Sequence, residues 1–157
     1  MRLSELVSIN LEHIKFDESL MTVIGKGNKE RTVYLNSACV DAIKKYLEIR
    51  PTDGVIDAKA LFLSERKTRI SKRTVQNLIK NDLRNIVGLT DHYSTHKLRH
   101  TAATLMYQYG NVDIRALQEI LGHESIATTE IYTHVDNSQI REAVESNPLA
   151  KYKPSEK

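Results

Sequence analysis

The chain has 157 residues, a formal net charge of +3, 40% hydrophobic residues and 27% charged residues. These values are typical of a single soluble globular domain and exclude a disordered chain. No apolar run reaches the roughly 18–20 residues that cross a bilayer, so we expect no membrane partner and no secretory leader. The single cysteine, Cys39, excludes a disulfide framework and a cysteine-based zinc site, and it favours a cytoplasmic setting.

The first part of the chain predicts a short helix followed by a small antiparallel sheet. Residues 1–9 read as the end of a helix. Three strands with alternating apolar residues are expected at residues 13–16, 20–24 and 31–35. The turns between them fall at residues 17–19 and at Gly25–Asn28, where glycine favours a tight reversal.

Helical spacing of apolar residues dominates the rest of the chain. Helices are expected over residues 37–49, 72–87, 95–109, 113–121, 125–134 and 137–145. Ser37, Ser71 and Thr95 are suited to cap the first three, and Gly110 closes the third. The sequence contains no repeat and no interdomain linker. It therefore predicts one domain, 1–157, that is mainly α with a three-stranded antiparallel sheet.

Basic residues gather in three places along the chain. They lie at residues 26–31, 66–84 and 97–100. A single run of this kind is usually solvated surface. Three runs that flank the same candidate chemistry favour a phosphate-rich ligand such as DNA.

Four side chains have types and positions suited to phosphate chemistry. His96 and Arg99 stand at i and i+3 near a helix start, so both project from one face. Lys26 lies in a glycine-flanked turn that lacks the spacing of a nucleotide-binding loop. Tyr132 carries a phenol whose ordinary pKa of about 10 requires cationic neighbours for attack. Taken singly, each also fits an ordinary packing or surface role.

Cleavage of a phosphodiester without a metal needs such a set. Guanidinium groups stabilise the charge that builds on the non-bridging oxygens, and their planar fork matches two of those oxygens. The leaving oxygen needs a proton donor. The nucleophile must hold a covalent intermediate, which a tyrosine phosphodiester does.

Five segments in order carry a resemblance to one family. They are Met1–Leu6 (MRLSEL), Gly25–Arg31 (GKGNKER), His96–His100 (HKLRH), Leu121–His123 (LGH) and Ile131–His134 (IYTH). Together they resemble the catalytic domain of tyrosine recombinases, the phage-integrase and Xer-like site-specific recombinases. The resemblance covers nearly the whole chain and implies the fold of these DNA breaking-rejoining enzymes.

The resemblance implies a role for each matched residue. Tyr132 would be the nucleophile that forms a 3′-phosphotyrosine, and Lys26 would be the general acid that protonates the leaving 5′ oxygen. The remaining implied phosphate ligands are Arg2, His96, Arg99 and His123. His96 is alternatively a proton acceptor. Glu5, one turn beyond Arg2, would orient the active-site cations, and its alternative is a glutamate that faces solvent.

The resemblance also implies partners and a setting. The expected partner is a double-stranded DNA recombination site, bound by four copies of the full-length protein, with no cofactor and no metal. A fragment without DNA is expected to be monomeric. DNA contacts are expected from Lys72, Arg73 and Asn77. Because the family's catalytic domain has helices before its first arginine and a DNA-clamping domain ahead of them, the chain looks N-terminally truncated, with weak recombination alone.

Three other interpretations fit parts of the sequence. A type IB topoisomerase relative shares the phosphotyrosine chemistry, but the sequence context around His96 and His123 favours a recombinase. A catalytically silent DNA-binding module predicts the loss of an active-site group, and all six are present. The spacing of His92, His96 and His100 could suggest a metal face, but no H-E-x-x-H pattern accompanies it.

Overall fold

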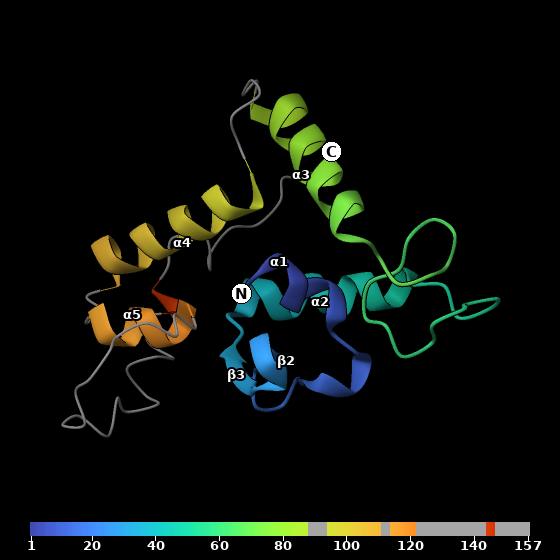
Figure 1. The fold of residues 1–157 in the computed structure, drawn as a ribbon, viewed down its shortest axis with the longest axis horizontal. Coiled ribbons are helices and arrows are strands. Elements are labelled where there is room, and N and C mark those ends of the chain that lie inside the picture. The colour runs from blue at the N-terminus through green and yellow to red at the C-terminus, as the bar shows by residue number, and fades with distance from the viewer. Residues whose placement is uncertain (88–93, 111–113, 122–143, 147–157) are drawn as a thin grey trace.

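The computed structural model describes residues 1–87, 94–110, 114–121 and 144–146 (Figure 1). Within these ranges the elements follow the order α1 Leu3–Ser8, β1 Ile14–Lys15, β2 Leu20–Ile24, β3 Glu30–Tyr34, α2 Ser37–Ile49, α3 Lys72–Val87, α4 Thr95–Tyr109 and α5 Ile114–Leu121. Short 3-10 turns, η1 and η2, cover Leu11–His13 and Lys26–Asn28. The prediction of a mainly helical domain with a three-stranded antiparallel sheet is confirmed. The expected helix over 125–134 lies outside the described residues, and so do residues 137–143 of the helix expected over 137–145.

The sheet has the strand order β1-β2-β3, and both pairings are antiparallel. The β2–β3 register places Met21 opposite Val33 and Val23 opposite Arg31. The expected first strand at 13–16 is wrong at both ends. His13 belongs to η1, where its Nδ1 accepts the N–H of Asn10 at 3.2 Å, and the chain turns after Lys15.

The helix caps differ from the predicted ones by one residue in two places. Asn36, not Ser37, caps α2, and its Oδ1 accepts the N–H of Cys39 at 2.9 Å. Ser94, not Thr95, caps α4 through the N–H of Lys97. In each pair both residues can cap a helix, and the backbone of the earlier one is extended, as a cap requires. Ser71 caps α3 as predicted, since its Oγ accepts the N–H of Thr74 at 3.0 Å.

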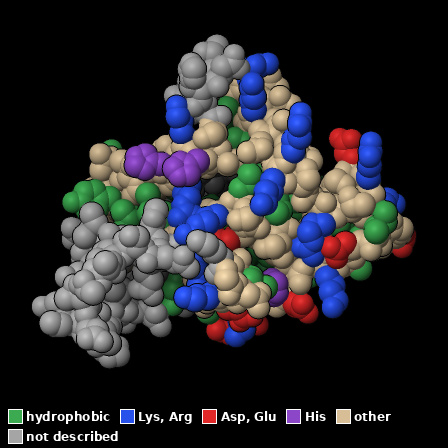
Figure 2. Space-filling view, viewed as in Figure 1, with side chains coloured by type: hydrophobic (Ala, Val, Ile, Leu, Met, Phe, Trp, Pro, Cys, Tyr) green, Lys and Arg blue, Asp and Glu red, His purple; other side chains and the backbone are tan. Residues whose placement is uncertain are grey.

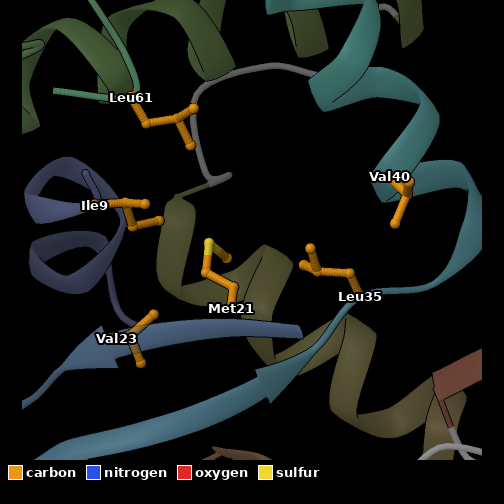
Figure 3. Close-up of a cluster of buried hydrophobic side chains, with 6 residues drawn as sticks. All are labelled: Ile9, Met21, Val23, Leu35, Val40 and Leu61. Atoms are coloured by element: carbon orange, nitrogen blue, oxygen red, sulfur yellow. The ribbon is translucent and has the colours of Figure 1, made fainter. Parts of the chain in front are cut away.

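The larger core lies between the sheet, α1, α2 and the loop after α2. Its buried side chains are Ile9, Met21, Val23, Leu35, Val40 and Leu61, and they converge from both sides of the sheet-to-helix interface (Figure 3). Met21 and Val23 share one face of β2 because side chains alternate along a strand. This core fixes the position of α1 over the sheet.

The smaller core joins α4 to α5, which lie beside each other at one side of the molecule (Figure 1). It contains Ala103, Met106, Ala116 and Leu117. Two of these four are alanines, whose small side chains leave room for a close approach of the helix backbones. None of the described helices is long and apolar enough to cross a membrane.

The loop between α2 and α3 is held by two arginines. Arg50 donates to the carbonyls of Ala58, Ala60 and Leu61. Arg69 donates to the carbonyls of Val7 and Ile9, to Asn10 Oδ1 and to Asp57 Oδ2. These bonds anchor the chain just before α3 and so set where that helix begins.

Candidate functional site

The buried carboxylate of Glu5 pairs with two arginines, the predicted Arg2 and also Arg31. Glu5 is 1% exposed, and its Oε1 accepts Arg2 Nη1 at 3.2 Å. Its Oε2 accepts Arg31 Nη2 at 2.9 Å and the Arg2 backbone N–H at 2.5 Å. The alternative of a glutamate that faces solvent is therefore wrong. Glu5 lies where it can orient Arg2, which is the geometry that its predicted role requires.

The electrostatics of Glu5 favour its charged form. Burial raises the pKa of the carboxyl, but the hydrogen bonds from the Arg2 backbone and the Arg31 guanidinium outweigh it. The net effect is a pKa below the ordinary value of 4.5. Glu5 is therefore an acceptor that stays ionised throughout the neutral range and keeps both guanidinium groups oriented.

Arg99 reaches the same region from α4. One of its terminal nitrogens, Nη2, donates to the Leu121 carbonyl at the end of α5. The other, Nη1, is buried and finds no hydrogen-bond acceptor in the part of the chain that the structure describes. Burial lowers the pKa of Arg99, with further lowering from the positive charges of Arg2 and Arg31 and an opposing effect of Glu5. Arginine remains protonated in proteins, so the result is a concentrated positive field suited to a phosphate.

The turn that carries Lys26 approaches this cluster. A Cβ added at Gly25 would lie 3.7 Å from Glu5 Oε1, so the backbone there passes close to the buried carboxylate. Gly27 has a φ of 71°, a left-handed conformation that glycine adopts without strain. The described backbone therefore places Lys26 at the same end of the molecule as Arg2 and Arg99. Its side chain lies outside what the structure describes.

His96 lies one helical turn before Arg99 on α4, and its side chain is exposed. Figure 2 shows histidine side chains of α4 beside lysine and arginine side chains, next to a hollow in the surface. His123 and Tyr132 lie outside the described residues. The structure thus brings together Arg2, Arg99 and the Lys26 backbone around Glu5 and places His96 on the helix that supplies Arg99.

A pocket of about 290 Å³ opens beside the cluster. Arg2 and Arg99 contribute to its wall, and apolar side chains of α1, α4 and α5 form most of the rest.

The predicted DNA-contact residues Lys72, Arg73 and Asn77 are all exposed on α3. Figure 2 shows basic side chains along that helix. The described residues contain no group of three or more histidine, cysteine, aspartate or glutamate side chains that could hold a metal ion.

Arg31 is a residue of this site to which the sequence analysis gave no role. It lies opposite the buried Val23 in the sheet register and on the same strand face as Val33, which packs against the larger core. An arginine on an apolar strand face needs a buried acid partner. That alternation along residues 31–35 is the signal that could have identified it.

The whole of this region matches a known protein family. The model of the phage integrase family matches residues 1–139. A curated relative, Tyrosine recombinase XerC of Caldanaerobacter subterraneus subsp. tengcongensis, is 63% identical over 150 residues, which are 96% of this chain and 42% of the relative. The chain thus spans less than half the length of that relative.

Solved structures give the same result. The crystal structure of XerA recombinase superposes with a TM-score of 0.70 and 37% identity over 90% of this chain and 51% of that one. XerH site-specific recombinase bound to its difH substrate, in a pre-cleavage complex, gives a TM-score of 0.68 and 27% identity over 80% of this chain and 36% of that one. The chain belongs to the phage integrase family of tyrosine recombinases.

Proposed function

We propose that residues 1–157 form the catalytic domain of a site-specific DNA recombinase. The Tyr132 hydroxyl attacks the scissile phosphorus and gives its proton to a base, for which His96 is the candidate. A 3′-phosphotyrosine forms, the bond from phosphorus to the 5′ oxygen breaks, and that oxygen leaves with a proton from Lys26. Strand transfer is the reverse attack by a 5′ hydroxyl of another strand. The bond energy is retained in the phosphotyrosine, so the reaction needs no nucleotide cofactor.

One observation carries this proposal: two arginines distant in sequence reach one carboxylate-centred cluster. Arg2 is the N-cap residue of α1, and Arg99 lies on α4. Arg2 pairs with Glu5, the charges of both affect the pKa of Arg99, and both arginines line the same pocket. Two converging guanidinium groups suit a phosphorane whose charge lies on two non-bridging oxygens. Arg99 Nη1, for which the described residues provide no acceptor, is a candidate donor to such an oxygen.

The proposed partner is double-stranded DNA. The XerH relative was solved bound to its difH substrate, which supports DNA as the ligand of this chain. Lys72, Arg73 and Asn77 are proposed DNA contacts on the exposed side of α3, where they would add sequence-independent affinity for phosphates. Four copies of the full-length protein are proposed to assemble on two DNA sites, whereas the chain alone is proposed to be monomeric without DNA.

The test is covalent capture of DNA. Nicked duplexes with a randomised core lose the short 5′-hydroxyl strand after cleavage, so that the adduct accumulates and can be seen on a denaturing gel. The unmodified chain should form an adduct, and Tyr132→Phe should form none while it still binds DNA. Tyr109→Phe, an exposed tyrosine on α4, is the matched control and should react like the unmodified chain. Absence of adduct from the unmodified chain, or its survival in Tyr132→Phe, would overturn the proposal.

A further inference from the structure

Arg31 forms hydrogen bonds to two other elements of the site. Its Nη2 donates to Glu5 Oε2 at 2.9 Å, and its Nη1 donates to the Ile120 carbonyl at 3.3 Å. One guanidinium therefore joins α1, β3 and α5, which are far apart in the sequence. Its side chain is 21% exposed, so these bonds form largely out of water.

The two bonds link Arg31 to two different parts of the site. Through Glu5, Arg31 shares a carboxylate with Arg2, whose Nη1 occupies the other oxygen. Through Ile120, it holds the carbonyl next to the one that accepts Arg99. Arg31 and Arg99 thus fix two successive carbonyls at the end of α5. The chain continues from there directly to Gly122 and His123.

We infer that Arg31 is a positioning residue for strand cleavage, which aligns Arg2 through Glu5 and the end of α5 through Ile120. The inference rests on the proposed function. Arg31 has no required contact with DNA in this role. A planar guanidinium suits it because the group can donate to two acceptors in fixed directions at once, which a lysine ammonium on a flexible stem does not reproduce.

Arg31 also controls the charge of Glu5. The charged groups that face Glu5 among the described residues are the Met1 amino group and Arg2 from the N-terminal segment, Arg31 from β3 and Arg99 from α4. Loss of Arg31 removes a direct hydrogen bond and a positive charge from a carboxyl that is 1% exposed. The pKa of Glu5 then rises, because the hydrogen bond and charge of Arg31 no longer oppose the effect of burial. A protonated Glu5 orients Arg2 poorly.

The experiment compares rates of adduct formation by Arg31→Gln, Arg31→Lys and the unmodified chain between acid and neutral pH. Arg31→Gln is expected to slow adduct formation about 10- to 100-fold, the cost of misplacing reacting groups, with DNA affinity changed less than about threefold. The acid limb of its pH–rate profile moves to higher pH. Arg31→Lys keeps a charge beside Glu5, so its acid limb stays near that of the unmodified chain while the rate falls.

Arg69→Gln is the matched control. Arg69 also makes several hydrogen bonds through a partly buried guanidinium, but it holds the loop before α3 and touches neither Glu5 nor α5. Its loss should lower the thermal midpoint and leave the acid limb in place. A purely structural role for Arg31 would give that same result.

The outcomes separate the two proposals. If the unmodified chain forms no adduct, the proposed function fails and this inference fails with it. If the unmodified chain reacts and Arg31→Gln reacts within about twofold of it, with the same acid limb, the inference alone is overturned. Circular dichroism reports whether Arg31→Gln is folded. If it is not, Arg31→Lys decides, and an unchanged rate in that variant overturns the inference.

Discussion

The sheet-centred part of the molecule, residues 1–87, and the α4–α5 pair are stabilised differently. Among the described residues, the first has a core of six buried apolar residues drawn from the sheet, α2 and three loops. Within the described ranges, the second has four, of which two are alanines. Because the free energy from apolar burial scales with area, the described residues of the α4–α5 pair contribute less of it.

A hydrogen bond and charge interactions connect the two parts. Arg31 reaches the Ile120 carbonyl from β3, and the charges of Arg2 and Glu5 act on Arg99 of α4. A pocket of about 290 Å³ lies at the same place, so the parts are not packed tightly there. Charge-assisted hydrogen bonds are directional, whereas apolar burial is not. The two arginines proposed to be catalytic, Arg2 and Arg99, therefore lie on either side of a junction that Arg31 bridges with a directed bond to Ile120.

The largest expected loss of stability comes from the core of the sheet-centred part. Leu61 is fully buried, and its backbone N–H donates to the Ile9 carbonyl at 2.9 Å. Leu61→Ala should lower the free energy of unfolding by about 2–5 kcal/mol, from lost transfer energy and the cavity left behind. Urea denaturation measures this change. Ile49→Ala, at a side chain that is 80% exposed, is the control and should stay within about 0.5 kcal/mol. Equal losses for the two variants would contradict the assigned core.

Acid should weaken the network around Glu5. Because the folded-state pKa of Glu5 lies below its ordinary value of 4.5, its stabilisation is complete above pH 4.5 and is lost as the pH falls below it through the folded pKa. Glu5→Gln should cost about 1.5–3 kcal/mol near neutral pH, the range for hydrogen bonds to charged groups. Urea unfolding of both proteins from pH 7 to pH 3 should show the two curves converging in acid.

The pairing of Asp57 with Arg69 does not disturb that comparison. The hydrogen bond from Arg69 also lowers the pKa of Asp57 from 3.8, but this pair is intact in both proteins. The difference between the two stability curves therefore isolates Glu5. Parallel curves would show that its carboxylate contributes nothing specific.

Loss of a methyl group in the smaller core should have an effect of about 1–2 kcal/mol. Ala116 is 1% exposed in α5, so Ala116→Gly loses both helix propensity and one buried methyl group. Amide hydrogen exchange should quicken in α4 and α5 and remain unchanged in β2 and β3. Ala42→Gly, at an exposed position in α2, loses only the propensity and is the control. Equal acceleration in the sheet would mean that the two parts unfold as one.

Local patterns in the sequence were sufficient to predict the order of the elements. Alternation predicted β2 at its observed bounds, and helical spacing predicted α2, α3 and α4 at theirs. The family resemblance implied that Glu5 orients the cations of the site, and the structure has Glu5 paired with Arg2. These features depend on neighbours within one turn or one strand, where residue type carries the information.

The missed features depend on tertiary contacts. Arg31 meets Glu5 across 26 positions only because α1 packs over the sheet. Arg50 and Arg69 hold the loop before α3 largely through backbone carbonyls, and a carbonyl carries no residue type that a sequence pattern can show. The errors at the caps arose because two adjacent residues could each accept the same N–H.

The smallest expected effects come from the helix caps. The same kind of substitution, loss of a side-chain cap, can be made in each of the two parts. Asn36→Ala and Ser94→Ala each remove one side-chain acceptor from a helix N-terminus, at a cost of about 1 kcal/mol. Asn36 is buried against the larger core, so its loss should lower the midpoint of global unfolding. Ser94 is exposed, so its loss should appear chiefly as faster hydrogen exchange in the first turn of α4, which holds His96.

Ser37→Ala and Thr95→Ala are the matched controls and should change neither measurement. A global effect of Ser94→Ala as large as that of Asn36→Ala would mean that α4 is held as firmly as the sheet.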